Sequence, residues 1–167
     1  NEAEFKYELN TVRDSLIHHN EANLTRGSLQ DLMRLLDSCG FYLSKMDIRQ
    51  ESTLHSQAIH EIGLTIDPPI DYYAMDESDR QAWLTQRLLD TEPLEYDRRQ
   101  ITIQSADILS VFDLMSEMRE EVSADCFGSY IISMTHEASH LLEVALLAKM
   151  SGLITADENG KVSSEIH

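Results

Sequence analysis

Apolar residues recur at helical spacing through most of this chain. Between Leu29 and Leu36 they fall on one side of a helix, Ser28 with Asp31 resembles a capping box at its start, and Gly40 supplies a C-terminal stop. Comparable patterns predict further helices from Ser52 or Thr53 to about Gly63, from Asp76 through Leu88, from about Ser105 through Met118, and from Ala138 to Met150. The chain is therefore predicted to be rich in helix.

Two segments lack this spacing and are predicted to be strands. Phe41 to Ile48 contains partly apolar residues with aromatic and branched members, and Gly40 marks a helix-to-strand junction before it. Residues 129–134 form a continuous apolar run of the kind found in strands that are buried on both faces. Residues 162–167 begin an alternating apolar and polar pattern that also suits a strand.

Each of the two main strands is followed at once by a helix, which is the order of a βα unit. We expect a helix-rich α/β fold that forms part of a (β/α) barrel, with about two parallel strands and five or six helices. Residues 1–167 then form one unit, with a first βα unit at 41–63, a helical insertion at 64–128 and a second βα unit at 129–151. Two strands cannot close a barrel, so we expect the isolated chain to be marginally stable, a homo-oligomer or packed in a non-native way.

The charge balance changes this picture by excluding some partners. Thirty acidic and 13 basic residues give a formal net charge of −17, which repels nucleic acid and anionic membrane surfaces. No stretch approaches the roughly 20 apolar residues of a membrane span. The two cysteines, Cys39 and Cys126, form no metal-binding spacing and suit a reducing compartment, which predicts a cytoplasmic protein. The first residues include no initiator Met, and both ends are expected to be cut from a longer chain.

The first candidate for chemistry is the polar run from Asp47 to Ser52, because barrel enzymes place their active sites at the C-terminal ends of their strands. Arg49 is the notable member, since its planar, permanently charged fork clamps a phosphate or a carboxylate through two parallel hydrogen bonds. From the residues alone, a structural salt bridge of Arg49 with Asp47 or Glu51 is an open alternative.

Two ordered motifs resemble the phosphoenolpyruvate carboxylase family. The first is the Asp-(Ile/Val)-Arg-Gln-Glu strand end followed by a His, here Asp47 to Glu51 and then His55. The second is the Tyr-(Val/Ile)-Ile-Ser-Met strand followed by an apolar helix, here Tyr130 to Met134 and then 141–148. The similarity runs from about residue 29 to 160, with a weaker middle between 66 and 104.

The resemblance implies that Arg49 holds the phosphate of phosphoenolpyruvate. In this family bicarbonate attacks that phosphate, carboxyphosphate and the enolate of pyruvate form, and the enolate captures the released carbon dioxide to give oxaloacetate. Arg49 would neutralise charge on the transferring phosphoryl group, with Gln50 and Ser52 as supporting substrate-binding donors. Asp47 and Glu51 are expected to orient the arginine, and His55 is expected to be structural.

The same resemblance implies that the isolated chain is inactive. The family uses Mg²⁺, but its acidic metal ligands and catalytic histidines fall outside the matching region, so no metal site is predicted within these residues. The expected metal-binding glutamate would follow residue 167, in a Pro-Leu-Phe-Glu context. The chain also departs from the family at Ser139-His140, where carboxylases commonly have Ser-Asp. Any role of that Asp in holding the corner between the second strand and the following helix is therefore not expected in this chain.

Two alternatives belong to other classes. The run from His136 to His140 reads HExxH, in which two histidines one helical turn apart bind zinc and the glutamate activates water. Glu158 or Glu165 would be the third ligand of such a zinc-dependent hydrolase. Because a pattern with three fixed positions arises readily by chance, this alternative ranks below the carboxylase. A free-standing acidic helical interaction module is the other alternative.

Overall fold

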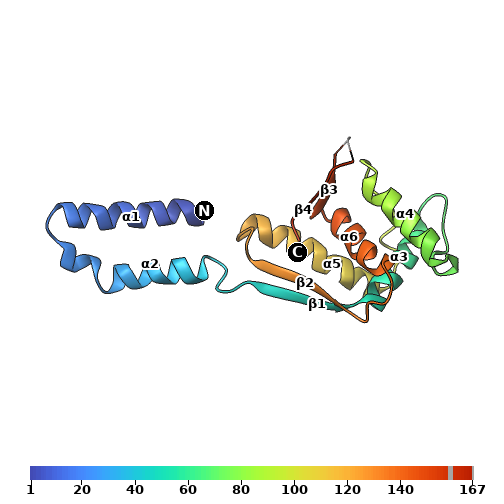
Figure 1. The fold of residues 1–167 in the computed structure, drawn as a ribbon, viewed down its shortest axis with the longest axis horizontal. Coiled ribbons are helices and arrows are strands. Elements are labelled where there is room, and N and C mark those ends of the chain that lie inside the picture. The colour runs from blue at the N-terminus through green and yellow to red at the C-terminus, as the bar shows by residue number, and fades with distance from the viewer. Residues whose placement is uncertain (158–159, 167) are drawn as a thin grey trace.

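The computed structural model describes residues 1–157 and 160–166, which form a helix-rich α/β structure (Figure 1). The predicted fold class is confirmed to this level, because the described residues contain six α-helices and one two-stranded parallel sheet. The sheet does not close into a barrel. In chain order the elements are α1 Glu2–His18, η1 Ala22–Thr25, α2 Ser28–Cys39, β1 Met46–Glu51, α3 Ser52–Thr65, η2 Tyr72–Ala74, α4 Glu77–Leu89, α5 Ile103–Glu121, β2 Phe127–Ser133, α6 Ser139–Met150, β3 Ile154–Ala156 and β4 Val162–Ser164.

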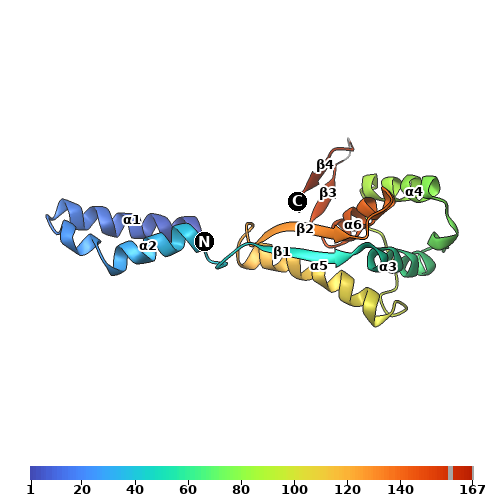
Figure 2. The same ribbon diagram turned by 60° about the horizontal axis from the view of Figure 1, so that its bottom comes forward.

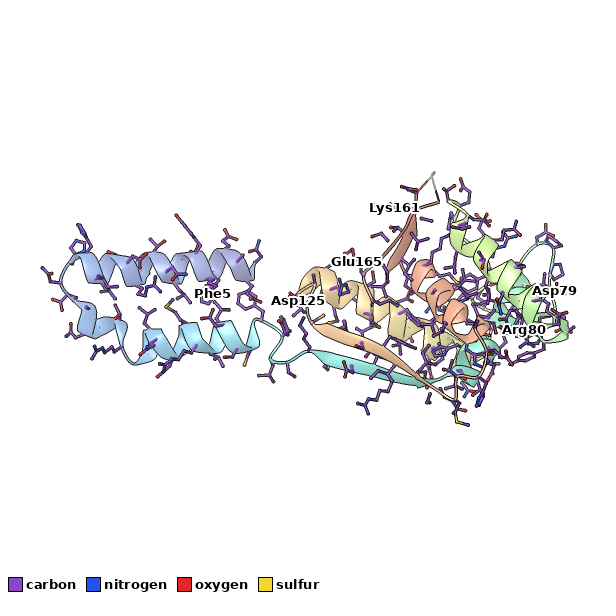
Figure 3. The ribbon with its side chains drawn as sticks, viewed as in Figure 1. Phe5, Asp79, Arg80, Asp125, Lys161 and Glu165 are labelled. Atoms are coloured by element: carbon purple, nitrogen blue, oxygen red, sulfur yellow. The ribbon has the colours of Figure 1, made fainter. Side chains whose placement is uncertain are left out.

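The first two helices form an antiparallel hairpin that stands apart from the rest of the chain (Figures 1 and 2). Its open end is held by the rings of Phe5 and Phe41, whose centroids are 5.9 Å apart; Phe5 is labelled in Figure 3. The capping box predicted at the start of α2 is wrong. Gly27 is the N-cap, at φ +82°, and its carbonyl accepts the N–H of Asp31, so no side chain caps this helix.

The parallel sheet pairs β1 with β2, and Arg49 lies opposite Ile131 in the register. The first strand begins five residues later than the predicted Phe41, because the chain turns at Leu43, a non-glycine residue with φ +61°. It pairs only from Met46, whose N–H donates to the carbonyl of Cys126. The shift carries the strand through the polar run to Glu51, so Arg49 lies inside the strand.

One face of this sheet is covered and the other is open. Ile48, Tyr130 and Ile132 pack against the hydrophobic core, in which Phe112 of α5 is fully buried, and Figure 2 shows α5 running along the two strands. Ile131 points to the other face and retains 40% exposure. The second strand is therefore buried on one face only in this chain, since nothing among the described residues covers its other face.

The core sits between α3, α5 and α6, with α4 packed on α6. Several elements are fixed at their starts by polar side chains, and the sequence predicted the contact at the start of α4. Asp76 accepts the N–H of Asp79 and caps α4, whereas α6 is held by a residue of another helix, described below. None of the described helices is both long enough and apolar enough to cross a membrane.

Candidate functional site

Arg49 lies on the open face of the sheet, close to the C-terminal end of β1. Together with Gln50, Glu51, Ile131 and Ser133 it lines an open hollow of about 460 Å³. Its guanidinium makes no hydrogen bond or ion pair with any residue that the structure describes. An arginine that is exposed and unpaired at the end of a parallel strand keeps its five donors available for an anion.

The acidic neighbours of Arg49 are occupied elsewhere. Asp47 accepts the backbone N–H of Ser129 across the sheet at 3.0 Å, and Glu51 accepts the hydroxyl of Thr53 at 2.8 Å. Within the described residues, neither carboxylate pairs with Arg49. The predicted orienting role of Asp47 and Glu51 is therefore wrong in this structure, and the structural salt bridge that the sequence left open is absent.

Neither of the two other residues predicted to bind substrate presents its side chain on the face of Arg49, although Gln50 contributes to the lining of the hollow. Gln50 alternates to the half-buried side of the strand, and its side-chain oxygen accepts the N–H of Glu51 at 3.0 Å. Ser52 is fully buried and its hydroxyl donates to the carbonyl of Met134 at 2.8 Å. Their role in binding substrate stays a prediction, but Ser52 visibly ties the start of α3 to the residue after β2.

The corner between β2 and α6 lies beside this strand end and is held by a second set of contacts. Met134 adopts the left-handed backbone conformation, at φ +57°. Ser139, the first residue of α6, donates its N–H and its hydroxyl to the carboxylate of Glu77 on α4, at 2.9 and 2.7 Å. The negative charge of Glu77 in this position also interacts favourably with the positive end of the α6 helix dipole. The corner is thus fastened to both α3 and α4.

The HExxH run does not have the geometry of a zinc site. Helix α6 begins at Ser139, so His136 and Glu137 precede it and the two histidines do not lie one helical turn apart. The Nδ1 atom of His140 instead accepts the backbone N–H of His136 at 3.4 Å. Helical spacing of this motif was the assumption behind the zinc hypothesis, and that assumption is wrong.

Of the two proposed third zinc ligands, only Glu165 lies within the described residues, and it is engaged elsewhere. Glu165 forms an ion pair with Arg119 at 3.2 Å, and Glu158 lies outside the described residues. Within 1–157 and 160–166 there is no group of three His, Cys, Asp or Glu side chains that could hold a metal ion. These residues therefore do not fit the Mg²⁺ that the resemblance implies, and the location of its ligands stays a prediction for the rest of a longer chain.

His55 is a buried histidine in the first turn of α3. Its Nε2 lies 2.8 Å from the hydroxyl of Tyr130, its ring meets that of Phe112 edge-on, and its Nδ1 has no partner among the described residues. Burial, with a smaller repulsion from His140, lowers the pKa of His55 to about 4. These contacts agree with the structural role predicted for His55, because a neutral ring packed among aromatic residues is part of the core.

The stability of the chain should therefore fall in mild acid. Unfolded His55 takes up a proton near pH 6.5, whereas the folded residue resists protonation down to about pH 4. As the pH falls between these values, the free energy of unfolding should decrease by about 3 kcal/mol from this residue alone. Urea titrations followed by circular dichroism from pH 4 to 7 measure the effect. His55→Gln should flatten the profile, whereas His18→Gln at an exposed site should not; equal profiles for the two variants would contradict the assignment.

A buried carboxyl group, Glu143 on α6, is the polar feature that the sequence interpretation missed. It is fully buried, and its Oε1 and Oε2 lie 2.8 Å from the hydroxyls of Tyr72 and Ser56, respectively. Burial raises the pKa of Glu143. Tyr72 is stacked in turn by Arg80, which Figure 3 labels on α4. The available signal was a single acidic residue in an otherwise apolar helix.

Comparison with known proteins places this geometry in a family. The family model described as phosphoenolpyruvate carboxylase matches residues 1–166. The chain is 40% identical over 151 residues to the phosphoenolpyruvate carboxylase of Prochlorococcus marinus subsp. pastoris, covering 90% of this chain and 15% of that protein. It is 38% identical over 160 residues to the phosphoenolpyruvate carboxylase of Parasynechococcus marenigrum, covering 96% of this chain and 15% of that protein. The chain thus spans about 15% of the length of these curated relatives. The matches give no support to a zinc hydrolase or to an acidic interaction module.

Proposed function

This chain belongs to the phosphoenolpyruvate carboxylase family, and we propose that it is the phosphate-binding segment of a longer enzyme that carboxylates phosphoenolpyruvate with bicarbonate. The products are oxaloacetate and inorganic phosphate. The observation that carries the proposal is Arg49, which is exposed and unpaired among the described residues at the C-terminal end of a parallel strand.

In this proposal, Arg49 stabilises the negative charge of the phosphoryl group as it is transferred. An oxygen of bicarbonate attacks phosphorus, the bond from phosphorus to the enol oxygen breaks, and carboxyphosphate and the enolate of pyruvate result. Carboxyphosphate then releases carbon dioxide and phosphate, and the enolate carbon bonds to the carbon dioxide. The guanidinium donates two parallel hydrogen bonds to the phosphoryl oxygens and stabilises their negative charge throughout the transfer.

The remainder of the site follows from the same proposal. The two strands are part of a (β/α) barrel whose other strands pair with the free edges of β1 and β2 and so enclose their open face. Gln50 and Ser52 support Arg49, with Ser52 acting through the bond that ties α3 to the end of β2. The enzyme uses Mg²⁺ held outside this segment, is cytoplasmic and is a homo-oligomer. The segment by itself is inactive because it lacks these parts.

The test is an assay of the full-length parent protein in which both products, oxaloacetate and inorganic phosphate, are measured. We expect oxaloacetate formation that requires both phosphoenolpyruvate and bicarbonate, with one inorganic phosphate released for each oxaloacetate. Isotopic carbon from bicarbonate should appear in the new carboxyl group. The 167-residue chain, assayed at the same concentration, should give no product. A parent protein that binds phosphoenolpyruvate but releases phosphate and pyruvate without carboxylation would contradict the proposal.

A further inference from the structure

The turn between β2 and α6 contains one polar contact that the proposed function does not use. The imidazole of His140, on the first turn of α6, accepts the backbone N–H of His136 through Nδ1 at 3.4 Å. An imidazole nitrogen accepts only when it carries no proton, so this contact requires the hydrogen of neutral His140 to lie on Nε2. This hydrogen bond joins His140 to the residue four positions before it and so closes the turn.

The surroundings of His140 are charged and titratable. His55 on α3 and Glu143 on α6 both interact electrostatically with the His140 ring. Glu77 and Arg80 lie on α4, where Glu77 holds the neighbouring Ser139 by two hydrogen bonds and Arg80 interacts with Glu143. His140 is half-buried among these groups.

The turn is coupled to the strand that carries Arg49. Met134 begins the turn, and its carbonyl accepts the hydroxyl of Ser52 at 2.8 Å. Ser52 follows the end of β1 directly and is fully buried, so a movement of Met134 is transmitted to the strand end. Across the sheet, Glu51 pairs with Ser133, the residue before Met134. The two strand ends are therefore fixed to each other, and the turn is fixed by His140.

We propose that His140 is a positioning residue for the phosphate site, which acts through the turn at 134–138 and Ser52 to hold the end of β1 in place. The inference rests on the proposed function, because it assigns the consequence of this contact to substrate binding. Without the Nδ1 acceptor the turn gains freedom, and the strand end that presents Arg49 is less well preorganised for the phosphate. Binding of phosphoenolpyruvate weakens, while the chemistry of bound substrate is little changed.

Two amide variants of the full-length parent enzyme test whether the acceptor at the Nδ1 position is what matters, since both are polar but only one keeps that acceptor. His140→Asn places an amide oxygen near the position of Nδ1 and keeps the acceptor. His140→Gln carries its amide near the position of Nε2 and loses it. We expect His140→Gln to raise KM for phosphoenolpyruvate by about three- to tenfold, the equivalent of one hydrogen bond, with kcat changed less than about twofold. His140→Asn should remain within about twofold of the parent in both constants.

Hydrogen exchange gives a readout that does not depend on activity. The amide of His136 should exchange faster in His140→Gln than in the parent, and His140→Asn should restore its protection. Equal KM values for the Asn and Gln variants, or unchanged exchange at His136 in both, would overturn the proposal. If the unmodified parent does not carboxylate phosphoenolpyruvate, the proposed function fails instead, and the exchange result still reports whether His140 holds the turn.

Discussion

Replacing Arg49 by alanine in the full-length carboxylase is expected to lower kcat/KM for phosphoenolpyruvate by about 10²- to 10³-fold, the loss typical of one preorganised donor to a developing charge. The fold should be unaffected, because the side chain is exposed and makes no hydrogen bond or ion pair with the described residues. Steady-state kinetics with varied phosphoenolpyruvate at saturating bicarbonate measure the loss, and the thermal unfolding midpoint should stay within about 2 °C of the parent.

Two further variants make this result specific. Arg49→Lys keeps the charge but loses the two-pronged geometry, so it should recover only part of the activity. Arg34→Ala removes the same charge from an exposed position on α2, in the hairpin that stands apart from the sheet, and should behave as the parent. Near-normal turnover by Arg49→Ala would refute the assignment of Arg49. Equal losses in Arg49→Ala and Arg34→Ala would show a general effect of net charge.

The strand-helix order of the fold could be predicted because it is written locally in the sequence. The continuous apolar run from Tyr130 to Met134 is followed at once by an apolar helix, and Asp76 marks a helix start because its side chain accepts the N–H of Asp79, three residues later. The start of β1 could not be placed, because it depends on pairing with β2, some 80 residues away in sequence, as in the bond from Met46 to Cys126. Long-range pairing of this kind leaves no local pattern.

The candidate site shows the same division. The motif identified Arg49, but sequence proximity suggested partners that it does not have, since Asp47 bonds across the sheet to Ser129. Neighbours in a strand point to opposite faces, so residues adjacent in sequence, such as Gln50, are poor candidates for contact with Arg49. The anchoring of Ser139 by Glu77 joins residues of separate helices, and only the three-dimensional packing brings them together.

A second large effect is expected at Glu143. Replacing it by alanine should lower the free energy of unfolding of this chain by about 3–5 kcal/mol, because the hydroxyl of Tyr72 is left buried without a partner, Ser56 loses one of its contacts and a cavity forms. Urea titration at pH 5 measures the loss. Replacing exposed Glu120 on α5 by alanine is the matched control and should change stability by less than about 0.5 kcal/mol.

The contacts of Glu143 indicate which form of the group is buried. Tyr72 donates to Oε1, and Ser56 Oγ lies 2.8 Å from Oε2 and 3.3 Å from the carbonyl oxygen of Ser52. A hydroxyl carries one hydrogen, so Ser56 donates to only one of these two oxygens. In the protonated form of Glu143 that we propose, Oε2 donates to Ser56 and Ser56 donates to Ser52. This assignment satisfies every group in the chain of contacts, and burial raises the pKa of Glu143 in the same direction. Glutamine reproduces the neutral form, since its oxygen accepts from Tyr72 and its amide donates to Ser56. Glu143→Gln should therefore lie within about 1 kcal/mol of the parent at pH 5.

The pH dependence of that variant tests the protonated state directly. Above the ordinary carboxyl value of 4.5 the unfolded chain loses the Glu143 proton, whereas the folded chain keeps it up to its raised pKa. This contribution to stability is complete below pH 4.5 and is lost as the pH rises through the folded-state pKa, opposite in sign to that of His55. The Glu143→Gln variant lacks this loss, so its stability relative to the parent should increase from pH 5 to pH 8. If Glu143 is instead buried as a carboxylate, Glu143→Gln should be destabilised by the same amount from pH 5 to pH 8, because an amide nitrogen would then face a hydroxyl that needs an acceptor.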